Sequence, residues 1–346
     1  MAQDRLNRRT YPDVFVNRDR YIDLFKTAIT KMSETVGSNI LAFYGVGGQG
    51  KSALRRHLST LAQSLDSHNY GGIKPVVVNL RTIDKSDPIN LLIEIRRQFL
   101  NVDIKLEAFD LALATVWENS PRAVHVMPKL DKSNWAGDFA ESVSTFLSGE
   151  VVEEAVDAIP MGRLGKWGYN KFNQRLIYDR HPYLSELKGV VKPEEWDLVW
   201  ILAQNLNWLY KREPYLRYLL FLDEYECVFD EGRTSSKWSG NDVDETVRTL
   251  ISETDRMLTV FFCREELPWK DSSDWKDDLE GNQKELMGLQ TEDARQWLIQ
   301  EGITDASLQE AMLNSAYGEG TTNKEIYPLL LAVSYTHLTL PTILLV

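Results

Sequence analysis

A glycine-rich stretch near the start of the chain has the residue types needed to hold phosphate. The segment GVGGQGKS, residues 45–52, fits the pattern G-x-x-x-x-G-K-[ST]. In such a loop the backbone N–H groups face the phosphates, Lys51 reaches the β- and γ-phosphates, and the Ser52 hydroxyl is placed to ligate Mg²⁺. The pattern predicts that the nucleotide-binding residues are Gly45, Gly47, Gly48, Gln49, Gly50, Lys51, Ser52 and Ala53.

Two adjacent carboxylates later in the chain supply what a phosphate loop needs for hydrolysis. Asp223 and Glu224 follow an apolar run within YLLFLDEYE, residues 218–226. Asp223 would hold Mg²⁺ through water, and Glu224 would orient or deprotonate the attacking water. The pair therefore predicts ATP and ADP with Mg²⁺ as ligands, and slow hydrolysis of ATP.

An arginine ends a further apolar run, RMLTVFFCRE, residues 256–265. At the carboxyl edge of a neighbouring parallel strand, Arg264 would face the same crevice as the phosphates and sense or stabilise the γ-phosphate. The alternative is an ordinary strand-end arginine in a surface ion pair. The predicted catalytic residues are thus Lys51, Glu224 and Arg264.

Strands and helices of an α/β protein are expected around these residues. NILAFY, residues 39–44, is a short apolar run typical of a buried strand, and leucines recur at helical spacing from residue 54 to residue 65. PVVVNL, residues 75–80, is the expected second strand. Strand, glycine loop and helix in this order place the loop N–H groups at a helix start, where the helix dipole favours negative charge.

The long interval between the second strand and the acidic pair reads mostly as helix. We expect a helical insertion over residues 103–192, of unassigned function. Near the C-terminus, one helix over residues 291–301 and another that begins at Ser307 would form a lid over the nucleotide. The predicted units are an arm over 1–37, an ATPase core over 38–270, a lid over 271–333 and a tail over 334–346.

Taken together, these motifs resemble the signal-transducing ATPases with numerous domains (the STAND class, bacterial type), which are related to AAA+ and NB-ARC ATPases. The resemblance implies a five-stranded parallel sheet of order 5-1-4-3-2, flanked by helices, with a small helical lid. VFVNRDRYIDLF, residues 14–25, resembles the segment near the adenine, which assigns Arg18, although Asn17 replaces the family's glycine and Asp19 its glutamate. EIYPLLLAV, residues 325–333, resembles the lid element whose proline touches adenine, which assigns Pro328.

Three functions are compatible with this site. The first is a nucleotide-dependent switch, in which ADP holds the lid closed and ATP releases it for self-association into a homo-oligomer. The second is an AAA+ ATPase that acts as a motor or nucleic-acid loader, and the third is a scaffold that binds nucleotide without hydrolysis. The resemblance also implies a protein partner bound through domains that would follow residue 333.

The net charge, the apolar runs and the cysteines of the chain limit which partners and which cellular compartment we expect. The net charge of −12 disfavours nucleic acid, and no apolar run of about 18 residues exists that would span a membrane. Two cysteines, Cys227 and Cys263, form no disulfide or metal pattern and indicate a cytoplasmic protein. The tail SYTHLTLPTILLV, residues 334–346, resembles the translated read-through of a sequencing adaptor, so we expect it to be artefactual.

Overall fold

The computed structural model describes the core and the lid, and it leaves parts of the chain outside the description. The described residues are 15–34, 39–65, 72–106 except 86, a few positions between 108 and 116, 195–230 except 214, 241–271, 275–317 and 325–343. Most of the predicted insertion, residues 117–192, and most of the predicted N-terminal arm lie outside these residues.

Five parallel strands form the central sheet. They are β1 (Asn39–Tyr44), β2 (Ile73–Asn79), β3 (Arg217–Asp223), β4 (Met257–Cys263) and β5 (Gln283–Glu285). The strand order is β2-β3-β4-β1-β5, which confirms the predicted order 5-1-4-3-2. Every residue of β3 and β4 is buried, as expected for central parallel strands covered on both faces. Because all strands run the same way, their carboxyl ends meet at one edge of the sheet.

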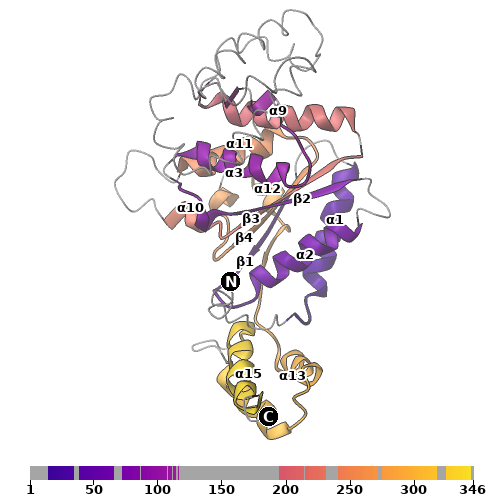
Figure 1. Cartoon of the computed structure of the whole chain (residues 1–346), viewed down its shortest axis with the longest axis vertical. Helices are drawn as coiled ribbons and strands as arrows, with labels where there is room; N and C mark the ends of the chain where they lie inside the picture. The colour runs from indigo at the N-terminus through magenta and orange to yellow at the C-terminus, as the bar shows by residue number, and fades with distance from the viewer. Residues whose placement is uncertain are drawn as a thin grey trace, which may run out of the picture.

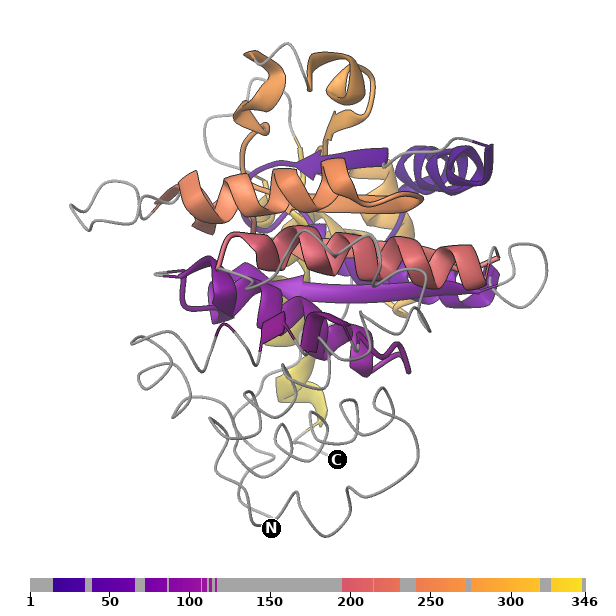
Figure 2. The ribbon, with the colours of Figure 1, turned by 90° about the horizontal axis from the view of Figure 1, so that it is seen from above.

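Helices cover both faces of this sheet (Figures 1 and 2). On one face α1 (Asp19–Glu34) and α2 (Lys51–Leu65) pack on an apolar cluster that includes Phe25, Leu54 and Phe221. On the other face lie α3 (Pro88–Leu100), α9 (Asp197–Arg212) and α11 (Asn241–Glu253). Short elements complete the core: η2 (Leu80–Thr82), α10 (Cys227–Asp230), η6 (Pro268–Asp271) and α12 (Lys276–Leu279).

The start of the predicted insertion is tied firmly to the core. Arg96 of α3 donates two hydrogen bonds to Asp110, of 2.8 and 2.9 Å, and both side chains are almost fully buried. The Asn205 side-chain oxygen on α9 accepts the N–H groups of Ala108 and Phe109. Buried charges persist only when they are paired and hydrogen-bonded, so this contact fixes where the chain leaves α3.

Three helices form a separate small layer beyond the sheet edge (Figure 1). They are α13 (Thr291–Gln300), α14 (Ala306–Ser315) and α15 (Pro328–Ile343), and they share their own apolar cluster, which includes Trp297 and Met312. We call this layer the lid. Its second helix begins earlier than predicted, because Asp305 rather than Ser307 caps it by accepting the Leu308 N–H.

The lid differs in extent from the segment set by the sequence. α12 and β5, which fall inside the segment predicted as lid, pack on the core beside β1. α15 continues across residue 334, the expected start of the tail, and there Ser334 bonds the Ser315 hydroxyl at 2.6 Å. Within the described residues, no helix has both the length and the apolar character needed to cross a membrane.

Candidate functional site

The glycine loop joins β1 to α2 and curls around the Lys51 side chain. The Lys51 ammonium donates to the carbonyl oxygens of Gly45 and Val46, the latter at 3.0 Å. The backbone of Gly48 has φ +88°, a left-handed conformation that glycine adopts without steric cost. α2 starts directly behind the loop, where Leu54 N–H donates to Gly50 O at 2.9 Å. The helix start therefore points its N–H groups into the loop, as phosphate binding requires.

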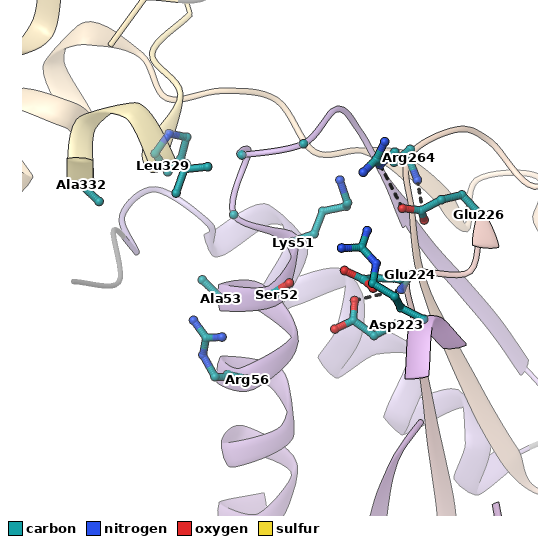
Figure 3. A pocket seen from close by; sticks show the side chains of 15 residues that line it. Lys51, Ser52, Ala53, Arg56, Asp223, Glu224, Glu226, Arg264, Leu329 and Ala332 are labelled. Atoms are coloured by element: carbon teal, nitrogen blue, oxygen red, sulfur yellow. Dashed lines mark hydrogen bonds and ion pairs between the residues drawn. The ribbon is translucent and has the colours of Figure 1, made fainter. Parts of the chain in front are cut away.

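A pocket of about 300 Å³ opens between this loop, the carboxyl ends of β3 and β4, and the lid (Figure 3). Most of the predicted site residues line it: Gly47, Gly48, Gly50, Lys51, Ser52, Ala53, Asp223, Glu224, Arg264 and Pro328. The structure thus brings together residues from four separate stretches of the chain.

Three predicted binding residues do not line this pocket. Gly45 and the buried Gln49 pack against each other within the loop, and a Cβ on Gly45 would collide with the Gln49 side-chain oxygen. Arg18 is buried behind the loop and donates to Gln49 O at 2.9 Å and to Met287 O at 2.8 Å. Burial lowers the pKa of Arg18, and nearby carboxylates partly offset that effect. Arg18 therefore braces the loop against the segment that leads into the lid.

Asp223 ends β3 and is nearly buried. Its Oδ1 accepts the Glu224 N–H at 3.1 Å, and its Oδ2 accepts Arg55 Nε from α2 at 2.8 Å. Each carboxylate oxygen has two lone pairs, so both oxygens keep one that could accept a water molecule.

Glu224 sits in a strained turn at the pocket wall. Its φ of +58° lies in the left-handed region, which costs a residue other than glycine about 1–2 kcal/mol. Arg81, just after β2, places Nε 2.7 Å from Glu224 Oε2 without the alignment of a hydrogen bond. That oxygen is buried and accepts no hydrogen bond from the described part of the chain. Strain of this kind persists only where the surroundings hold it, and it occurs often at active sites.

A third carboxylate, Glu226, follows two residues later. Its Oε1 forms an ion pair with Arg264 Nε at 3.1 Å, and its Oε2 accepts the Arg264 backbone N–H at 3.2 Å. Arg264 therefore lines the pocket and also forms an ion pair. The two alternatives considered for it, a residue that faces the phosphates and a strand-end arginine in an ion pair, do not exclude each other. Burial lowers the pKa of Lys51, and Glu226 is the main charge that opposes this effect.

The lid supplies an apolar wall. Pro328, Leu329 and Ala332 of α15 line the pocket, and Leu329 N–H donates to Gly48 O at 3.1 Å. A Cβ on Gly48 would meet the Leu329 Cβ at 3.3 Å, so glycine permits this close approach. A nucleotide in the pocket would touch the core and the lid together.

The donor set fits Mg²⁺ beside a nucleotide. Ser52 offers a hydroxyl at the start of α2, and Asp223 offers the two remaining lone pairs described above. Among the described residues no group of three histidine, cysteine, aspartate or glutamate side chains forms a ready metal cage. Such a site suits Mg²⁺, which keeps several waters and shares its ligands with phosphate oxygens.

Several residues of the pocket wall, and the partner of Asp223 just outside it, were not among the predicted site residues. Arg55 lies one helical turn after Lys51, a spacing that would have placed it near the loop. Arg81 follows β2 at the carboxyl edge, where the rule applied to Arg264 also holds. Glu226 lies within the quoted acidic run. The remaining missed residues are Arg56, Leu329 and Ala332.

No protein-family model and no curated protein matches this chain. Solved structures that resemble it include the ORC2 protein of Aeropyrum pernix in ADPNP–ADP complexes, with 12% identity and a TM-score of 0.47 over 97% of this chain and 66% of that one. The ORC1 protein of Aeropyrum pernix in complex with DNA has 11% identity and a TM-score of 0.43 over 96% and 62%. Cdc6p from Pyrobaculum aerophilum has 10% identity and a TM-score of 0.45 over 96% and 65%.

This chain therefore spans less than two thirds of the length of those three structures. Its own geometry settles the class of fold. A parallel sheet of order β2-β3-β4-β1-β5, with the glycine loop between β1 and α2, is the fold of a P-loop NTPase.

Proposed function

We propose that this chain binds ATP and hydrolyses it as a P-loop ATPase of the AAA+ type. The observation that carries the proposal is one pocket lined by Lys51, Ser52, Asp223 and Glu224. The first two come from the loop and the start of α2, and the last two come from the end of β3. These are the residue types that phosphoryl transfer needs on either side of a terminal phosphate.

Each group has a role that its position supports. Lys51 and Arg264 would neutralise the phosphate oxygens, and Ser52 with Asp223 would hold Mg²⁺, Asp223 through water. Mg²⁺ held there would supply charge neutralisation to the phosphate oxygens. Glu224 would orient the attacking water and accept its proton, because its carboxylate lines the pocket next to Asp223. Its ion pair with Arg81 would have to open for this role.

A nucleotide-dependent switch is the second proposal, and the contact between lid and loop favours it. Leu329 N–H holds Gly48 O, and Arg18 links Gln49 O to Met287 O at the entry to the lid. A ligand that rearranges the loop would alter these bonds and so bias the position of the lid. Self-association controlled by ADP and ATP remains part of this proposal.

The motor or loader alternative shares the same residues and differs in partner. The net charge of −12 argued against nucleic acid, whereas one of the similar solved structures is a DNA complex. We therefore propose DNA as a ligand to be tested beside nucleotide.

Two variants test the ATPase. Lys51→Ala should weaken ATP binding roughly a hundredfold, because it removes a charged donor to the phosphates. Glu224→Gln should keep binding and slow hydrolysis about 10²–10⁴-fold, the usual contribution of a general base. Calorimetry and phosphate release would measure the two effects. The exposed Lys26→Ala on α1 is the matched control. Tight ATP binding by Lys51→Ala would refute the site.

The nucleotide released on heat denaturation separates the two modes of action. Near-stoichiometric ADP that survives purification, with turnover unaffected by DNA, would support the switch. Brisk turnover that DNA stimulates would support the motor or loader, and chromatography of the released nucleotide beside a phosphate assay gives both readings.

A further inference from the structure

We propose that Glu226 is a positioning residue that aims Arg264 at the terminal phosphate and so sets the preference for ATP over ADP. This inference rests on the proposed ATPase function and deepens it. It assigns a role to the carboxylate that the mechanism above leaves unused.

Glu226 contacts Arg264 through both of its carboxylate oxygens. One carboxylate oxygen forms an ion pair with Arg264 Nε at 3.1 Å, and the other accepts the Arg264 backbone N–H at 3.2 Å. The carboxylate thus contacts both the side chain and the backbone of Arg264, as the dashed lines in Figure 3 mark. The Glu226 side chain is 13% exposed whereas that of Arg264 is 57% exposed, so the less exposed partner holds the more exposed one.

The contact with Glu226 leaves other donors of the Arg264 side chain for the terminal phosphate. An arginine has one N–H on Nε and four on its two terminal nitrogens. Because Glu226 binds through Nε, the terminal nitrogens keep the fork that binds two phosphate oxygens. Lysine has no counterpart to Nε, so it could not be held and aimed in this way.

The turn that carries Glu226 is anchored through the neighbouring residue Tyr225. Its neighbour Tyr225 is fully buried, with its ring packed edge-on against Phe261 and Trp269. Tyr225 N–H also donates to Phe262 O on β4 at 3.1 Å. The turn that carries Glu226 is therefore fastened to the strand that leads into Arg264, and both partners share one rigid frame.

Simple charge predicts the opposite effect, which makes the proposal testable. Glu226 carries a negative charge at the pocket wall, so its removal should tighten both ADP and ATP if it acts only through its charge. If it positions Arg264, Glu226→Gln should instead weaken ATP binding about tenfold and change ADP binding by less than about twofold.

The experiment measures the affinities of ADP and a non-hydrolysable ATP analogue by calorimetry. It compares the unaltered chain with Glu226→Gln and Glu265→Gln. Glu265 is exposed, adjoins Arg264 and is not among the residues that line the pocket, so it controls for the charge change. Arg264→Gln should reproduce the loss, and the double variant should lose no more than Arg264→Gln alone.

A second substitution keeps the test decisive if Glu226→Gln does not fold. Arg264→Lys retains the charge at an exposed site, and it should still lose the ATP preference because Nε is gone. Tighter binding of both nucleotides by Glu226→Gln, or an unchanged preference in both variants, would overturn the inference while the ATPase stands. An unaltered chain that binds neither nucleotide would refute the proposed function, and the inference with it.

Discussion

At the scale of single residues, the acidic edge of the pocket is already paired with arginines. Each of the three carboxylates after β3 lies against a guanidinium from a different element. The pairs are Asp223–Arg55, Glu224–Arg81 and Glu226–Arg264. Phosphates and Mg²⁺ would therefore enter a site whose carboxylates are already paired, while Lys51 and Arg56 add further positive charge to the pocket wall. The ligands must compete for partners that are already engaged.

Of these three pairs, Asp223–Arg55 affects the proposed Mg²⁺ site most directly, because Asp223 would hold the ion. Arg55 Nε holds Asp223 Oδ2 at 2.8 Å, and the positive charge of Arg55 repels a cation bound there through water. We expect Arg55→Gln to lower the Mg²⁺ concentration that gives half-maximal ATP hydrolysis, roughly fivefold, which is a change of about 1 kcal/mol. A Mg²⁺ titration of phosphate release measures this midpoint.

Arg56→Gln is the control for that titration. It removes the same charge from the next residue of α2, which lines the pocket and is not the partner of Asp223. A higher Mg²⁺ midpoint in Arg55→Gln than in the unaltered chain would mean that Arg55 supports the aspartate rather than competes with the metal.

At the scale of elements, the turn after β3 that carries Glu224 and Glu226 is hydrogen-bonded to α11 through Tyr225. Asp244 of that helix accepts the Tyr225 hydroxyl at 2.7 Å, Trp269 Nε1 at 2.9 Å and Arg248 Nε at 2.9 Å. Asp244 and Tyr225 are buried, so these bonds satisfy a carboxylate that would otherwise be costly. The same network keeps Glu224 in its left-handed conformation.

Tyr225→Phe should destabilise the folded chain by roughly 1.5–3 kcal/mol, because it removes a donor from a buried carboxylate. Urea unfolding measures the loss. Tyr218→Phe is the matched control, because its buried hydroxyl donates to the neutral Leu206 carbonyl at 3.0 Å, and it should cost about 1 kcal/mol. An equal cost in both variants would contradict a special role for the Asp244 network.

The same variant has a signature at high pH. Burial, followed by the nearby Asp244 charge, raises the pKa of Tyr225 well above its usual value. The unfolded chain loses this proton near pH 10 while the folded chain keeps it. The contribution of Tyr225 is therefore fully present below about pH 10 and is lost as the pH rises further. Tyr225→Phe should show a shallower alkaline decline than the unaltered chain.

At the scale of the whole molecule, the lid and the core meet through the glycine loop and the segment before α1. Asn17 donates to Asp293 of α13 at 2.6 Å from a backbone with φ +48°, which asparagine tolerates better than most residues. Arg18 then spans from the loop to Met287 at the lid entry.

Arg18→Gln should loosen the lid, because the short amide cannot reach both carbonyl oxygens. We expect amide hydrogen exchange in α13 and in the glycine loop to speed up about tenfold, with α9 unchanged. Arg20→Gln on the exposed side of α1 removes the same charge and should leave the exchange as it was. Exchange that rises equally in α9 would indicate general destabilisation rather than release of the lid.

The sequence by itself determined the sheet, the glycine loop and the edge at which Asp223, Glu224 and Arg264 lie. The reason is that apolar runs and helical spacing depend on neighbours along the chain, and parallel strands bring their carboxyl ends to one edge. Strand order followed from the resemblance of these motifs to a known class, and the observed sheet agrees with it.

Only the tertiary structure decided which side chains face one another across the pocket. Arg55 and Asp223 are 168 positions apart, and no local pattern links them. The bracing contacts of Arg18 could not be predicted either, because its partners Gln49 O and Met287 O belong to segments that meet only in the folded chain. The left-handed turn at Glu224 is likewise set by packing around Tyr225, which outweighs the backbone preference of a glutamate.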